Sequence, residues 1–180
     1  VHFEQIALTP QGACVSQRLA ECVGADPVLY DKYAQLVSKH VTVIARDVNG
    51  RHVVTRALAH AGKPNIVFDA MLVHCCEMGV SRHGCCIIQK ALETSDDETK
   101  ERLVNSMLQH VLAYVQDSFG NYLVQALLDL NQDAVTKRVV QALLHNVAPL
   151  ACNKFASNVV EKCFRLASEE IRQLFIDELT

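Results

Sequence analysis

Five pairs of side chains, spaced four residues apart, have the chemistry to hold the edge of a flat polar molecule. Most pairs combine a short side chain with a longer amide or acid. The pairs are Ala13/Gln17, Arg51/Thr55, Cys85/Gln89, Asn121/Gln125 and Ser157/Glu161. Residues four apart on a helix lie about 6 Å apart on one face, so two hydrogen-bonding groups can meet one ligand there. Planar nucleic-acid bases are ligands of this kind.

The neighbours of each pair strengthen this interpretation. The residue after the first member is often flat or small, and Tyr122 or His52 can stack on a base. The five residues are Cys14, His52, Cys86, Tyr122 and Asn158. The residue after the second member is basic in four cases and predicts weak contacts to phosphates. These are Arg18, Arg56, Lys90 and Lys162, with Ala126 in the fourth case.

All five pairs belong to a twelve-residue pattern that recurs about every 36 residues. It begins at Thr9, Asp47, Ser81, Asp117 and Asn153. Such a period is typical of stacked helical units, each of which packs on its neighbours. The sequence therefore predicts an all-α fold, an α-solenoid (a curved superhelix) of three-helix repeats. We expect one domain over residues 1–180, with repeats at about 1–25 (partial), 26–62, 63–97, 98–133, 134–168 and 169–180 (partial).

Each pattern also contains the signals of a helix start and of a buried face. The first residue is a helix N-cap type in every case, and Pro10 follows Thr9 where proline is well tolerated. Counted from the glycine of the pattern (Ala156 in the fifth), positions three, four, seven and eight are mostly apolar and form one stripe. Positions one, two, five and six are expected to face outward. Longer amphipathic segments are expected at about 28–46, 65–79, 99–116 and 135–148, with loops at 62–64 and 95–97.

The bulk composition excludes several classes of protein. No apolar run approaches about 20 residues, which excludes a membrane span. The net charge of −3 weakens a nucleic-acid interpretation, although a whole-chain charge says little about one face of a solenoid. The eight cysteines are scattered and fit a reduced intracellular protein. The chain begins without a methionine and within a helix, so it resembles a piece of a longer protein, and a lost targeting segment stays open.

Two chemical alternatives arise from a group of histidines and cysteines in the middle of the chain. The group is His74, Cys75, Cys76, His83, Cys85 and Cys86. Adjacent cysteines on a helix point about 100° apart and lack the spacing of a zinc site, so Cys75 and Cys76 are expected in the core. A Cys86–His83 nucleophile would need a cleft and an orienting third group, which the sequence does not supply. We therefore expect no metal, no cofactor and no enzymatic activity.

The pattern resembles the Pumilio (PUF) repeat along essentially the whole chain. The strongest matches are SRHGCCIIQKALE, DSFGNYLVQALL and NKFASNVVEKC. The resemblance implies a second helix in each repeat that binds single-stranded RNA, about one base per repeat, with the RNA antiparallel to the protein. It implies that the paired residues read the base edge and that the residue between them stacks.

Carried over residue by residue, the resemblance implies a short RNA sequence. Ser157 with Glu161 resembles the guanine reader, Asn121 with Gln125 the uracil reader, and Cys85 with Gln89 the adenine reader. This gives 5′-GUA-3′, the core of a UGUA element whose first U would be read by a repeat after residue 180. Arg51 with Thr55 matches no common pair and is interpreted as base-tolerant. Ala13 with Gln17 resembles a degraded adenine reader.

The resemblance further implies a cytoplasmic regulator that binds UGUA elements in mRNA 3′ untranslated regions and represses expression after transcription. Repressor or deadenylase-recruiting proteins are expected on the convex face, with no membrane or small-molecule substrate. One alternative is a protein-binding α-solenoid of HEAT or armadillo type, which needs no fixed short–amide pair. The other is a divergent nucleolar relative that binds RNA with low specificity, which the pairs at Arg51 and Ala13 leave open.

Overall fold

The computed structural model describes residues 2–60 and 65–179 and contains helices but no strand in these ranges. The chain forms two compact units, Val1–Ala91 and Leu92–Thr180. The expected loop at 62–64 lies outside the described residues. None of the described helices is long and apolar enough to cross a membrane.

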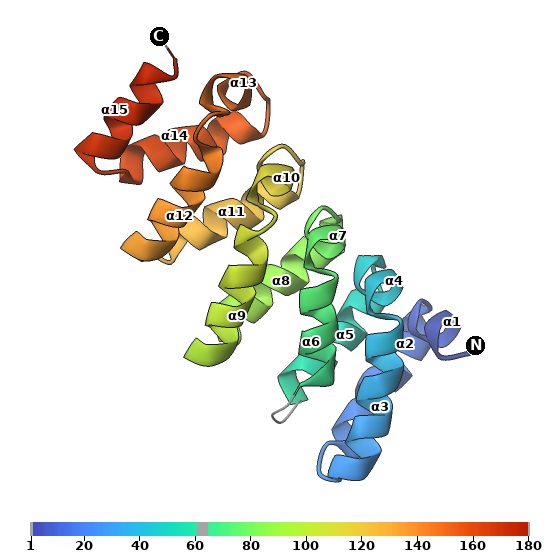
Figure 1. The fold of residues 1–180 in the computed structure, drawn as a ribbon. Helices are drawn as coiled ribbons and strands as arrows, with labels where there is room; N and C mark the ends of the chain where they lie inside the picture. The colour runs from blue at the N-terminus through green and yellow to red at the C-terminus, as the bar shows by residue number, and fades with distance from the viewer. Residues whose placement is uncertain (1, 61–64, 180) are drawn as a thin grey trace. The chain divides into compact units, whose positions relative to one another are not determined.

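The first unit contains seven helices and most of an eighth, among the residues described there (Figure 1). They are α1 (His2–Ala7), α2 (Pro10–Val23), α3 (Pro27–Lys39), α4 (Val41–Arg46), α5 (Gly50–His60), α6 (Ile66–Val73), α7 (Cys75–Gly79) and α8 (Arg82–Thr94). The division between the units falls within α8. Helix α2 packs on α5 and α3 packs on α6, so each helix meets its counterpart one repeat later.

The second unit continues the same order of helices (Figure 1). They are α9 (Asp97–Leu108), α10 (Val111–Val115), α11 (Gly120–Asp129), α12 (Asp133–Leu143), α13 (Val147–Ala151), α14 (Ala156–Leu166) and α15 (Glu169–Asp177). Helix α11 packs on α14, which is the same pairing as that of α2 with α5.

The long amphipathic segments expected from the sequence are each two helices rather than one. The break falls at His40, His74 and His110, whose backbone φ lies between −119° and −103° with ψ near +15°, outside the helical region. In the last repeat Asn146 takes this place, and His145 before it has a φ of +69°. Each complete repeat therefore has three helices, and the turn between the first two redirects the chain toward the pattern-bearing helix.

The five expected N-cap residues all accept hydrogen bonds from the start of the next helix. Thr9 Oγ1 accepts from the Gly12 amide at 3.0 Å, and Ser81 Oγ accepts from the Gly84 amide at 3.2 Å. In the other three repeats one side-chain oxygen accepts from two successive amides, as Asp117 Oδ1 does from Phe119 and Gly120, both at 2.8 Å. These bonds satisfy donors that a helix start leaves free. This sequence prediction is confirmed.

Loss of one cap is expected to destabilise its repeat measurably. The substitution Asp117→Ala removes the acceptor of two amides and should cost about 1 kcal/mol. Gln132 precedes α12 without a side-chain cap bond, so Gln132→Ala is the matched control and should be near neutral. Thermal unfolding, together with amide exchange at Phe119 and Gly120, measures the difference. Equal stability of the two variants would contradict the capping role.

The apolar stripe of the pattern forms the core, as predicted. In α11 the four stripe residues Leu123, Val124, Leu127 and Leu128 are fully buried. The glycine of the pattern lets the start of the pattern-bearing helix lie close to the short helix before it, as Gly84 of α8 does with α7. A Cβ at Gly84 would collide with the backbone carbonyl of Met78, so no side chain fits there without a shift.

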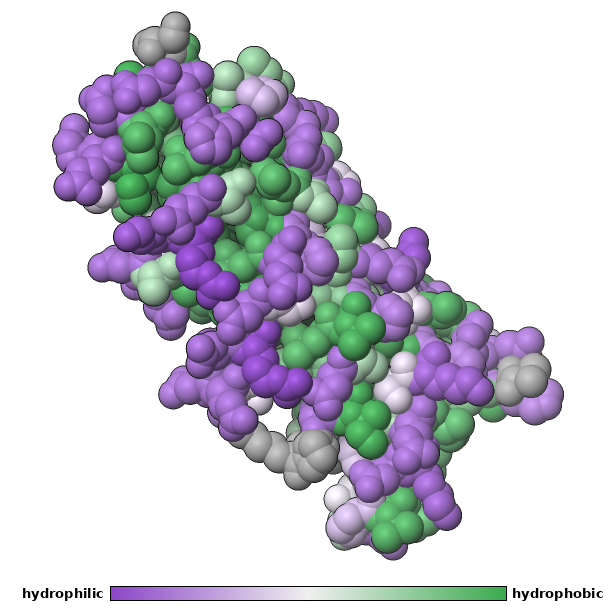
Figure 2. All heavy atoms as spheres, viewed as in Figure 1, coloured by the Kyte–Doolittle hydropathy of each residue, from purple (hydrophilic) through white to green (hydrophobic). Residues whose placement is uncertain are grey.

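The first repeat departs from this burial. At stripe positions three and seven, Val15 is 63% exposed and Leu19 is 44% exposed, whereas their counterparts in the other four repeats are buried. Apolar side chains also reach the surface on α3, where Val28 and Leu29 are exposed. Figure 2 shows hydrophobic atoms over the beginning of this helix. The stripe is therefore buried by repeat-to-repeat packing and not by its own helix alone.

Candidate nucleic-acid interface

The residue at position two is exposed in every repeat. Tyr122 on α11 is 56% exposed. The remaining members, Cys14, His52, Cys86 and Asn158, are exposed as well. Five helices therefore present one outward side chain at the same point of their first turn, and the sequence prediction of an outward position is confirmed. An exposed aromatic ring such as that of Tyr122 has a free face on which a base can stack.

Position one does not face outward in three of the repeats, contrary to the expectation from the pattern. Ala13, Cys85 and Asn121 are buried, and Asn121 is only 3% exposed. Arg51 and Ser157 are half-buried. Polar side chains at this position reach backbone carbonyls three or four residues earlier in the chain.

Polar residues at position one are held by those carbonyls. Asn121 Nδ2 donates to the carbonyls of Asp117 at 2.9 Å and Ser118 at 3.1 Å. Cys85 Sγ donates to Arg82 O at 3.3 Å, and Ser157 Oγ donates to Lys154 O at 3.4 Å. These bonds fix the side chains in place before any ligand arrives.

Position five is half-buried in four repeats and exposed in the fifth, at Glu161. Gln125 Nε2 donates to Asn121 Oδ1 at 3.0 Å, so this pair is in direct contact. Among the residues with described positions, no partner of Gln125 Oε1 is found. The carboxylate of Glu161 lies 3.3 Å from Arg165, and both side chains are exposed. The pairs thus offer hydrogen-bonding atoms at the surface. Their polar position-one side chains are already held by hydrogen bonds within the chain.

Two of the basic residues at position six, Arg56 and Lys162, link successive pattern-bearing helices. Lys162 Nζ donates to Asp129 Oδ1 at 2.6 Å and to the Gln125 carbonyl at 3.2 Å, which joins α14 to α11. Glu21 joins α5 to α2, since it lies 3.5 Å from Arg56 and 2.8 Å from Arg18. These two acids were not among the residues predicted from the sequence. Glu21 and Asp129 share position nine of the pattern, and that shared spacing was the available signal. Because the cations are paired, the predicted phosphate contacts compete with these ties.

Arg51 and His83 lie close together in the first unit. Arg51 Nε is buried and has no hydrogen-bond partner. The pKa of His83 is lowered from its ordinary value, first by burial and then by the positive charges of Arg51 and Arg82. His83 is therefore neutral at pH 7, and the second and third repeats bring positive groups to one place.

Titration of His83 tests this proximity. Its pKa is expected below the ordinary value of about 6.5, and Arg51→Gln should raise it. Arg82→Gln is the comparison and should raise it less, because the effect of Arg51 is larger. Since the folded-state pKa lies below the unfolded value, the unfolded chain binds more protons as the pH falls through this range. His83 therefore lowers stability in acid. An NMR titration of the His83 ring carbon measures the pKa, and an unchanged value in Arg51→Gln would contradict the contact.

The cysteines and histidines considered for metal binding do not form a site within the described ranges, where no group of three or more metal-ligating side chains converges. All eight cysteines are free thiols. Cys75 is buried in the core as expected, while Cys76 is only half-buried. Burial raises the pKa of the Cys163 thiol to about 12, so this cysteine is an inert core residue.

A family model decides what these repeats are. The model of the Pumilio-family RNA binding repeat matches residues 74–108, 110–144 and 146–180, more than half of the chain. The chain belongs to the Pumilio family of RNA-binding repeat proteins. Members of this family are RNA-binding proteins and not enzymes, which confirms the predicted family and the expectation of no enzymatic activity.

Curated Pumilio relatives agree with this assignment. Pumilio homolog 12 of Arabidopsis thaliana is 40% identical over 146 residues, which are 78% of this chain and 24% of the relative. A Pumilio domain-containing protein of Schizosaccharomyces pombe is 31% identical over 176 residues, which are 97% of this chain and 26% of the relative. The chain thus spans about a quarter of the length of these relatives.

A solved Pumilio structure supports the fold. The Puf4 RNA-binding domain, bound to the HO endonuclease RNA 3′ UTR recognition sequence, matches with a TM-score of 0.81 and 29% identity. The match covers 98% of this chain and 57% of the Puf4 chain. The predicted all-α solenoid of Pumilio-type repeats is confirmed, and the chain is a Pumilio-family RNA-binding domain.

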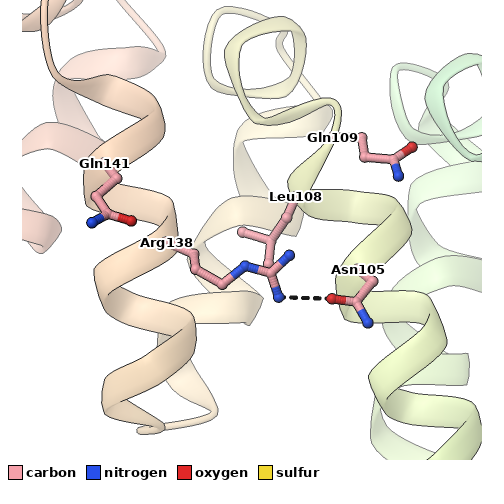
Figure 3. Close-up of a pocket in the computed structure, with 5 residues that line it drawn as sticks. All are labelled: Asn105, Leu108, Gln109, Arg138 and Gln141. Carbon is pink, nitrogen blue, oxygen red and sulfur yellow. Dashed lines mark hydrogen bonds between the residues drawn. The ribbon is translucent and has the colours of Figure 1, made fainter.

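A pocket in the second unit is lined by none of the candidate RNA-binding residues at positions one, two, five and six. It has a volume of about 430 Å³ and lies between α9 and α12 (Figure 3). Its lining residues are Asn105, Leu108, Gln109, Arg138 and Gln141. Arg138 Nη1 donates to Asn105 Oδ1 at 2.7 Å, which joins the first helices of two successive repeats. The pocket shares no residue with the paired positions.

Proposed function

We propose that this chain binds single-stranded RNA by sequence and selects 5′-GUA-3′ within a UGUA-type element. Ser157 with Glu161 selects guanine, Asn121 with Gln125 selects uracil, and Cys85 with Gln89 selects adenine. The observation that carries the proposal is the pair Asn121/Gln125 beside an exposed Tyr122. Two amides in contact and an aromatic face one residue away match the edge and the face of one base.

The guanine assignment follows from the chemistry of Glu161. A carboxylate only accepts hydrogen bonds, and the Watson–Crick edge of guanine offers two donors, N1 and N2. Glu161 is exposed, and its ion-pair partner, Arg165, is an exposed side chain that can turn away. Exposed ion pairs of this kind contribute little stability, so exchange of Arg165 for a base is inexpensive.

The wider role belongs to the same proposal. RNA binding of this kind suits a cytoplasmic regulator that acts on mRNA 3′ untranslated regions and represses expression after transcription. The similar Puf4 domain is bound to a 3′ UTR recognition sequence, which supports this class of target. Effector proteins on the outer face remain part of the proposal.

In vitro selection of RNA with this chain tests the proposal. Enrichment of GUA or UGUA supports it, and a polarisation titration then compares UGUA with UCUA oligonucleotides at one fixed salt concentration. Equal affinities for these two would sink the guanine assignment. Binding without any enriched sequence would favour the low-specificity alternative, which the unusual pairs Arg51/Thr55 and Ala13/Gln17 support.

A further inference from the structure

The second repeat lacks the means to hold a base edge from two points. Thr55, at position five, donates its hydroxyl to the carbonyl of Arg51 at 2.9 Å. This bond occupies the hydroxyl within the helix, and a threonine side chain is shorter than the glutamine found at this position in three other repeats. The repeat therefore retains one long polar group, Arg51, where the others have a small one.

Arg51 forms no ion pair within the described part of the chain. Its Nε is buried without a hydrogen-bond partner. Asp47, four residues earlier, uses Oδ1 to accept from the amides of Asn49 and Gly50, both at 2.8 Å. An unpaired buried donor of a charged group costs free energy. Arg51 as a whole is only half-buried, so an anion can approach the exposed part of its side chain and offset its charge.

Further basic side chains lie in the same region as Arg51. His52 follows it and is exposed, and Arg82 and His83 begin the next pattern-bearing helix. The charges of Arg51, Arg82 and His52 all act on His83, with Asp47 the acid that opposes them. We call these four residues, Arg51, His52, Arg82 and His83, the Arg51 patch. Arg51 and Arg82 carry the permanent positive charges of this patch, and these attract an anion more than a neutral base edge does.

We propose that the Arg51 patch binds a phosphate of the RNA backbone, so that the second repeat adds affinity without selecting a base. This inference rests on the proposed RNA-binding function. The planar guanidinium matches two phosphate oxygens at once, and its charge is neutralised by the ligand. A guanine edge could also accept from Arg51, but it would leave that charge uncompensated, and Thr55 would add no second contact.

The test places one neutral methylphosphonate linkage at a time in the two nucleotides that follow GUA. For the wild-type chain, one such linkage is expected to weaken binding roughly tenfold, the value of one charge-assisted contact. Arg51→Gln should weaken binding of the natural RNA by a similar factor and remove the effect of that linkage. Arg51→Lys keeps the charge without the planar fork and should recover part of the loss.

Controls separate this contact from general charge and from folding. Arg46→Gln removes one positive charge from the same unit at a residue whose guanidinium is paired with Glu77 at 2.8 Å, and it should keep the effect of the linkage. A thermal melt of Arg51→Gln should match the wild type.

Two results would overturn the inference while the proposed function stands. One is GUA-selective binding in which no linkage matters. The other is a guanine preference at this step that disappears in Arg51→Gln, which would make Arg51 a base reader. Loss of GUA selectivity in the wild-type chain would instead overturn the proposed function.

Discussion

The double substitution Asn121→Ser with Gln125→Glu is expected to change the preferred base of the fourth repeat from uracil to guanine. It gives this repeat the pair that the fifth repeat has naturally, Ser157 with Glu161. The fold should tolerate the change, because Ser157 Oγ donates to the carbonyl three residues earlier and Ser118 O lies at the same place in the fourth repeat. The stability cost is about 1 kcal/mol for the hydrogen bond that serine does not replace.

The expected change in preference is large because two base contacts are exchanged. Uracil loses its amide pair and guanine gains a carboxylate acceptor, and each good bidentate contact contributes about 1–3 kcal/mol. The preference for GUA over GGA should therefore shift by about 2–6 kcal/mol in favour of GGA. Polarisation titrations with GUA, GGA, GAA and GCA oligonucleotides measure it.

Single variants show whether the two positions act together. Gln125→Glu alone leaves Asn121 Nδ2 on its two carbonyls and should give a smaller gain for GGA. If the double variant binds all four oligonucleotides as the wild type does, positions one and five do not read the base, and the residue assignments of the proposed function are wrong.

Glu161→Gln is expected to reduce the selectivity of the fifth repeat for guanine by about 1–3 kcal/mol, or about 5- to 150-fold. The amide keeps the size of the side chain but replaces an acceptor by a donor, which then faces a donor of guanine. The comparison of GUA with AUA in wild-type and variant chains measures the change.

Removal of any acidic residue raises the affinity for RNA of every sequence. A second variant must therefore separate this general effect of charge from the loss of guanine selectivity. Glu170→Gln removes an exposed carboxylate from α15 outside the paired positions and should leave the ratio of GUA to AUA unchanged. Arg165→Gln removes the ion-pair partner of Glu161 and should also preserve it. An unchanged ratio in Glu161→Gln would exclude this residue as the guanine reader.

The sequence by itself determined the repeat, its helix starts and its core. Thr9, Asp117 and their counterparts cap helices because short acceptors before a helix act locally, within three residues. The stripe of Leu123 and Leu127 is buried because the 3.6-residue period fixes which side chains share a face. The exposed position of Tyr122 follows from the same period.

Only the tertiary structure decided how the outward positions divide. Asn121 and Cys85 are buried although the period places them opposite the core, and the helical period of a single repeat does not reveal this burial. Lys162 meets Asp129 and Arg56 meets Glu21 across neighbouring repeats. These contacts join residues more than 30 positions apart. The sequence of a single repeat shows which side chains share a face of its helix. The neighbouring repeats decide which charged side chains are paired. The packing of the repeats leaves Arg51 Nε without a hydrogen-bond partner among the described residues.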